Sequence, residues 1–276
     1  MDLYWMLEYG KVLCGYIVLM FLWPTVVFWK HLSKKSRIYH LSFCVLVQTT
    51  LISSIILAMG LFDILNKKWV ICFFYGVFLI STYRIIRPVQ FCILGFQRKN
   101  IKGILLYCRN RVATFVRAIW KDISTRILEY ILLLIIVIFG MIYFSYGAFF
   151  VKCYGGFDVM THHQWVNSLV GGDIFPNGIY PEAMHCFIYC LHVLFNIRIY
   201  SIMKFLQCIH IMVFFLSIYG LLREIFSWRY SPVFVLGLFL ALDTNIFNCA
   251  YSIYRLQITL PMEFGLNTQF LCALFL

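Results

Sequence analysis

The sequence predicts an all-α membrane protein with about seven transmembrane helices, the last of them incomplete. Hydrophobic residues make up 63% of the 276 residues, charged residues only 12%, and the mean hydropathy is +0.87. So few polar side chains cannot cover a water-soluble globule of this length. The apolar residues are also collected in long runs, as helices that cross a hydrocarbon core require.

The net charge of +12 would suit a nucleic-acid-binding protein, but the arrangement of the charges does not. The Lys and Arg residues lie at the ends of the apolar runs and in one segment between them. The positive-inside rule places such segments on the cytoplasmic side of a membrane. We therefore expect membrane lipids as partners and no nucleic acid.

The first region, residues 1–128, is predicted to contain three spans. They cover residues 12–29, 41–62 and 69–83. The sequence HLSKKSR after the first span has no acidic residue and indicates a cytoplasmic loop, which places the N-terminus outside. Pro88 is expected to end or kink the third span, because proline cannot donate a helical hydrogen bond.

Residues 97–127 close this region with basic side chains against a single acid, Asp122. Apolar residues recur between the charges at helical spacing, which predicts an amphipathic helix on an anionic cytoplasmic leaflet. A regulatory or partner-docking role is the other interpretation of the same pattern.

The second region, residues 129–276, begins with a span over 130–151 that runs outward. It leads into an exoplasmic loop, residues 152–199, in which we expect helices near 160–170 and 184–197. The later helix is too short to cross a membrane, so we expect it to lie at the outer interface.

Two further spans are predicted over residues 199–222 and 232–247, joined by a loop with Arg223 and Arg229 on the cytoplasmic side. The last apolar run, 265–276, has too few residues to span. We expect the chain to be the N-terminal part of a longer protein.

Asp158 is the first candidate functional residue of the exoplasmic loop. It follows Gly155-Gly156 directly after the fourth span, so its carboxylate would lie near the headgroup plane and could meet a lipid phosphate. His162 is four residues further on and would share its helix face. An Asp at this position also suits a helix N-cap, and His162 with His163 also suits a solvated interfacial pair.

Other candidates surround this loop. His185 begins the second loop helix, and Lys204 lies near the outer end of the span 199–222. The second exoplasmic connection, residues 248–263, contains Arg255 and Glu263. An acid beside an apolar span is costly, which favours a functional role for Glu263, whereas His185 fits loop packing as well as substrate contact.

The order of these features resembles the opening of the GT-C glycosyltransferases. An Asp follows the outer end of a span, a short helix reads HxxWxxxL before glycine, and a Tyr-Pro precedes a helix led by His185. The next span closes on Arg223-Glu224. The resemblance covers residues 129–276 and implies a membrane enzyme that moves a sugar from a polyprenyl-phosphate carrier to an acceptor at the outer membrane face.

The resemblance also implies roles for the candidate residues. Asp158 would be the base or a metal ligand, with Glu263 as a second catalytic acid. The substrate-binding candidates are His162, His163, His185, Lys204 and Arg255, the last two as clamps for the lipid phosphate. The family's Asp-Glu pair is Asp158-Val159 here, which leaves a divalent metal open as a cofactor. A bacterial cytoplasmic membrane is the implied location, and the lipid-linked sugar donor is the implied partner.

A transporter, a flippase or a non-catalytic membrane subunit is the main alternative. Such a protein would carry ionisable residues inside its spans, and Asp243 and Lys204 are the best cases. Because most acids of the second region lie in its loops, we favour the enzyme. A third interpretation is that this stretch is inert without the rest of the site.

Overall fold

The computed structural model describes residues 3–33, 37–95, 124–150, 157–176, 178, 182–242 and 258–273. Within these ranges the regular structure is helical, apart from one isolated bridge between Pro176 and Gly178. Five helical stretches are long and apolar enough to cross a membrane: Leu3–Val27, Ile38–Leu61, Lys67–Ile85, Ile127–Phe149 and Ile199–Ile225. The all-helical class is thus confirmed, and the five stretches are compatible with an integral membrane protein.

The predicted count of seven spans is not reached in the described residues. The helices that overlap the predicted sixth and seventh spans are α11 (Ser231–Ala241) and α12 (Pro261–Ala273). Both are shorter than the roughly 17 residues that a spanning helix needs. The sixth and seventh spans therefore stay predictions.

The first span is longer than the sequence predicted and is interrupted by a π-helical turn. It consists of α1 (Leu3–Ile17), η1 (Val18–Leu22) and α2 (Trp23–Val27), and the short α3 (Trp29–Leu32) follows. Pro24 explains the interruption, because its nitrogen has no hydrogen to donate and the turn before it must adjust. The helix thus begins well before the predicted start at residue 12.

The next two spans are α4 (Arg37–Leu61) and α5 (Lys67–Gly95). α5 continues beyond Pro88, so this proline does not end the helix, and the alternative expectation of a kink stays a prediction. Proline is tolerated where neighbouring turns can adjust to the missing hydrogen bond. An amphipathic helix was also predicted in residues 97–127. Most of that segment lies outside the described ranges, because residues 96–123 are not described.

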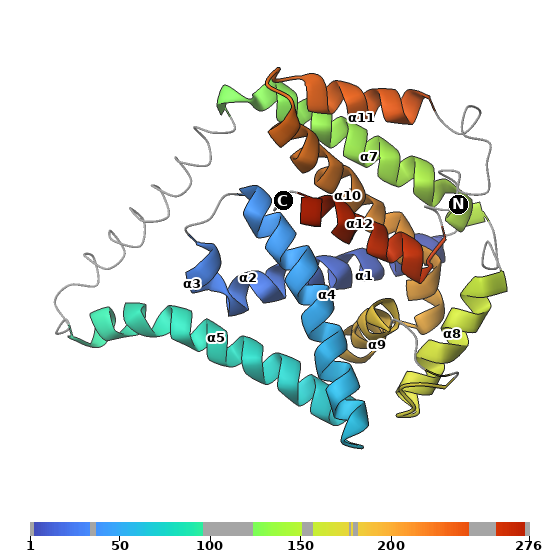
Figure 1. Cartoon of the computed structure of the whole chain (residues 1–276). Helices are drawn as coiled ribbons and strands as arrows, with labels where there is room; N and C mark the ends of the chain where they lie inside the picture. The colour runs from blue at the N-terminus through green and yellow to red at the C-terminus, as the bar shows by residue number, and fades with distance from the viewer. Residues whose placement is uncertain are drawn as a thin grey trace.

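α10 (Ile199–Ile225) is the central helix of the bundle (Figure 1). In its most apolar window 72% of the residues are buried, against 39% or less in the other four candidate spans. It packs against α1, α11, α12 and α7 (Ile127–Phe150). The contact with α7 needs a glycine, because a Cβ at Gly140 would lie 2.4 Å from the ring of Phe215.

The two loop helices are present as α8 (Phe157–Val170) and α9 (Ala183–Phe195), but α9 is not at the surface. Every residue from Met184 to Leu191 is buried. The prediction that residues 184–197 lie at the membrane interface is therefore wrong, because the helix is enclosed by the rest of the protein. A short helix that is apolar on all sides is typical of a protein core, and its apolar surface explains why it is enclosed.

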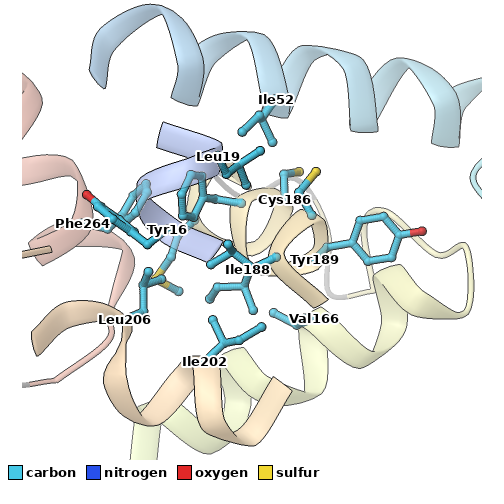
Figure 2. Close-up of a cluster of buried hydrophobic side chains, with 14 of the residues drawn as sticks. Tyr16, Leu19, Ile52, Val166, Cys186, Ile188, Tyr189, Ile202, Leu206 and Phe264 are labelled. Atoms are coloured by element: carbon cyan, nitrogen blue, oxygen red, sulfur yellow. The ribbon is translucent and has the colours of Figure 1, made fainter. Parts of the chain in front are cut away.

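Figure 2 shows how the neighbouring helices enclose α9. Ile188 of α9 lies among side chains from several elements, including Tyr16 of α1, Val166 of α8 and Ile202 of α10. Ile52 of α4 belongs to the same cluster of buried residues. One hydrophobic core thus contains residues from both predicted regions, 1–128 and 129–276.

Candidate functional site

Asp158 lies in the first turn of α8, and its side chain is exposed. The helix begins at Phe157, one residue earlier. A carboxylate at this position is favoured by the partial positive charge of the helix N-terminus. The structure thus presents Asp158 at the protein surface on a regular helix, where a reacting group could approach it.

His162 follows Asp158 after one turn of α8 and is buried. Its Nδ1 atom lies 3.0 Å from Nε2 of His185, so the two rings share a hydrogen bond between α8 and α9. The Trp165 ring contacts both imidazoles, with ring centroids 5.0 Å from His162 and 5.5 Å from His185. These three rings join the two loop helices.

Glu182 extends this chain of contacts. Its Oε2 atom lies 2.9 Å from Nδ1 of His185, and both side chains are buried. The two atoms are not aligned as a hydrogen bond, so the contact is electrostatic in character. A carboxylate facing Nδ1 favours the proton on that nitrogen, and Nε2 of His185 then accepts the hydrogen bond from Nδ1–H of His162.

Burial keeps the imidazole of His162 neutral. Burial, together with the smaller effect of the nearby His185, lowers the pKa of His162 to about 4, and Asp158 opposes this shift by a still smaller amount. Burial also lowers the pKa of His163, which is half-buried. A buried imidazole with so low a pKa is a poor proton acceptor at neutral pH. Asp158, one turn earlier on the same helix, is exposed, and its role as base stays a prediction.

The other predicted substrate-binding histidines differ in exposure. His185 is fully buried, so a substrate could not contact it directly. His162 has 7% of its surface exposed, whereas His163 is half-buried on the same helix. We conclude that His162 and His185 position α8 against α9, and the substrate-binding role of His163 stays a prediction.

Lys204, predicted as a phosphate clamp, is covered by aromatic side chains. Its Nζ atom lies 3.9 Å from the ring centroid of Trp5, and only 6% of the residue is exposed. On the previous turn of α10, Ser201 donates a 2.5 Å hydrogen bond to Glu8, which also forms an ion pair with Lys11. This cluster fastens α1 to α10.

Glu263 and Arg255 were predicted to form the second half of the site. Glu263 is buried in the first turn of α12, while Arg255 lies outside the described residues. Next to Glu263, the carbonyl of Phe264 accepts a 3.1 Å hydrogen bond from His210 of α10. No hydrogen bond or ion pair between Glu263 and Asp158 occurs in the described part of the chain.

The predicted divalent metal finds no complete ligand set in the described ranges. No group of three or more His, Cys, Asp or Glu side chains there is arranged to hold a metal ion. The buried His162 and His185 share a hydrogen bond, and Glu182 lies close to His185. Asp158 as a metal ligand stays a prediction.

Glu182 is the residue that the sequence analysis missed. It precedes His185 by three residues, a spacing that brings two side chains together at the start of a helix. The spacing is visible in PEAMH, but the sequence alone does not show that both side chains are buried.

No known protein family matches this chain, and no curated protein or solved structure is similar enough to count as a relative. The fold and the site therefore define only a helical protein with five candidate membrane spans and an exposed acid beside a buried Glu–His–His cluster.

Proposed function

We propose that this chain belongs to a membrane glycosyltransferase that moves a sugar from a polyprenyl-phosphate carrier to an acceptor at the outer membrane face. The observation that supports this proposal best is the position of Asp158. It is an exposed carboxylate on a helix that the buried His162 and His185 fasten to the core.

The chemistry of the transfer requires a base and a group that holds the departing phosphate. Asp158 accepts the proton of the acceptor hydroxyl as the acceptor oxygen attacks the anomeric carbon and the bond to the lipid phosphate breaks. Because His162 is neutral and buried, its part is to hold the helix that carries Asp158. A catalytic group on a regular helix is placed more precisely than one on a free loop.

The lipid phosphate needs a cation, and Arg255 now suits this role better than Lys204. Lys204 is 6% exposed and lies over Trp5. Arg255 belongs to the second predicted exoplasmic connection, and the guanidinium group binds phosphate oxygens through two parallel hydrogen bonds.

An apolar groove between α1 and α7 supports a long lipid chain as part of the substrate. Its volume is about 480 Å³, and Met6, Tyr9, Ile142 and Phe149 are among its lining residues. The groove follows the half of α7 that leads to the exoplasmic loop. An isoprenoid chain in this groove would bring its phosphate toward the same end of the bundle as α8.

The transporter alternative draws support from the buried ionisable residues of the spans, which include Glu8, Lys204 and Glu129. The positions of these residues along their helices argue against a transport site. Glu8 and Lys204 each lie only about 8 Å from the start of their helices, and Glu129 is in the first turn of α7. Transport sites are typically built near the bilayer midplane.

The test is the Asp158→Asn variant of the complete protein, assayed for transfer of sugar from a polyprenyl-phosphate donor. We expect transfer to be abolished, while membrane insertion and the melting temperature stay unchanged. Asp173→Asn is the matched control, because Asp173 is an exposed acid of the same loop and should leave transfer intact.

Two outcomes would contradict the proposal. Retained transfer in Asp158→Asn removes this residue from the mechanism. Uptake of a lipid-linked sugar into vesicles without any transfer, by the wild-type protein, would favour the transporter.

A further inference from the structure

We propose that a pocket between α3 and α5 binds the headgroup of an anionic phospholipid. The pocket is independent of the proposed catalytic site and lies in the first predicted region. Its volume is about 450 Å³, within the range of small-molecule binding sites. The polar part of its lining consists of Lys30, His31, Ser81 and Arg84.

The charge of this pocket is positive. Lys30 and Arg84 are exposed, and neither forms a salt bridge in the described part of the chain. No Asp or Glu is among the lining residues. Because two cations come together here without a carboxylate, the pocket suits a phosphate group.

The polar groups are held in place by the local structure. His31 shares a 2.8 Å hydrogen bond with the hydroxyl of Tyr39, which ties α3 to the start of α4. On the other side, α5 is a regular helix that carries both Ser81 and Arg84 at i,i+3 spacing. The pocket is therefore built on helices and does not depend on a loose surface loop.

The rest of the lining indicates a lipid and not a free phosphate. Val26, Val27, Phe28 and Ile85 supply an apolar wall, and Trp29 is 43% exposed beside them. Tryptophan is enriched at the level of lipid headgroups. A phospholipid would place its phosphate against Lys30 and Arg84 and its acyl chains along this wall.

The position in the membrane agrees with this ligand. The pocket lies at the ends of two candidate spans, on the side where the basic sequence after the first span predicts the cytoplasm. Basic pockets between transmembrane helices on this side are known as binding sites for anionic headgroups.

The test measures binding of short-chain phosphatidylglycerol to the purified complete protein in a neutral detergent, with phosphatidylcholine of the same chain length for comparison. We expect binding of phosphatidylglycerol and at least tenfold weaker binding of phosphatidylcholine. In the double variant Lys30→Gln/Arg84→Gln the affinity for phosphatidylglycerol should fall about 30-fold, the loss expected for two charges near an anionic group.

Lys67→Gln/Lys68→Gln is the matched control, because it removes two exposed charges from the opposite end of α5. The control should bind phosphatidylglycerol like the wild type, and Lys30→Arg/Arg84→Lys should keep most of the affinity. The substituted residues are all exposed, so the melting temperatures of these variants should agree with that of the wild type.

Three results would overturn the proposal. They are equal binding of both lipids, an equal loss in the control variant, and displacement of the lipid by millimolar inorganic phosphate. The last result would mean that the pocket recognises phosphate alone and that the lipid is not its ligand.

Discussion

Glu129 and Glu182 are both buried glutamates at the starts of helices, but their surroundings differ. Glu129, at the start of α7, accepts hydrogen bonds from the Tyr219 hydroxyl at 2.5 Å and from Nε of Arg229 at 3.3 Å. Nε of Arg223 lies 3.6 Å from the same carboxylate. Glu182, beside α8, faces the imidazole of His185.

This difference separates a structural cluster from one suited to function. The charge of Glu129 is balanced by two guanidinium groups that stay protonated at all physiological pH values. The Glu182 cluster instead includes His162, whose pKa burial lowers to about 4, so its contribution to stability depends on pH. We infer that the Glu129 cluster fastens α7, α10 and the segment before α11 together, whereas the Glu182 cluster joins α8 to α9 in a pH-dependent way beside Asp158.

The largest expected effect is the loss of stability in Glu129→Ala. Removing the acid leaves two arginines and a tyrosine hydroxyl without their carboxylate in a buried site. Breaking a buried ion pair costs about 3–5 kcal/mol, and the partial exposure of Arg223 and Arg229 points to the lower end of that range. Thermal unfolding in detergent measures the change.

Glu224→Gln provides the control for this prediction, because Glu224 is exposed at the same end of the bundle. Its melting temperature should stay within a degree or two of the wild type. Equal melting temperatures for Glu129→Ala and the control would mean that the Glu129 cluster does not stabilise the fold.

Much of the fold could be predicted from the sequence, because membrane spans depend on length and hydropathy alone. The span predicted over residues 130–151 is observed as α7, Ile127–Phe150. The span predicted over residues 199–222 is observed as α10, Ile199–Ile225. In both cases long apolar runs set the helices, and only the ends differ.

The position of α9 could not be predicted in this way. Its length excludes a full crossing, but a short apolar helix can lie on a membrane or inside a bundle. The helices that enclose α9 determine which of the two positions it takes. These helices include α10 and also α1 and α4, which are far from α9 in the sequence. The same long-range packing buries His185, which local spacing had left as a candidate for substrate contact.

A second prediction concerns the pH dependence of the Glu182 cluster. The pKa of His162 is lowered to about 4 in the fold, chiefly by burial, against about 6.5 in an unfolded chain. At a pH between these two pKa values, His162 binds a proton in the unfolded state but not in the folded state. This group therefore destabilises the fold by up to about 3 kcal/mol as the pH falls from 6.5 to 4.

The His162→Asn variant isolates this contribution, because asparagine can keep a hydrogen bond to His185 but does not titrate. The wild type should lose more stability than the variant when thermal unfolding is compared at pH 7 and pH 4.5. Parallel pH profiles would mean that His162 is no more buried than an ordinary surface histidine, and the contrast with Glu129 would lose its basis.

The smallest effect is expected for a third buried cluster, which lies within the spans and carries no charge. His210 donates from Nε2 to the Phe264 carbonyl, so its Nδ1 accepts the 2.6 Å hydrogen bond from the Tyr16 hydroxyl. Tyr16→Phe removes one neutral hydrogen bond, which costs about 1 kcal/mol inside a membrane protein. Tyr83→Phe, at an exposed position, is the control for the same thermal measurement and should have no effect. A loss in Tyr16→Phe as large as that in Glu129→Ala would show that burial, and not the balance of charge, determines how strongly these clusters stabilise the bundle.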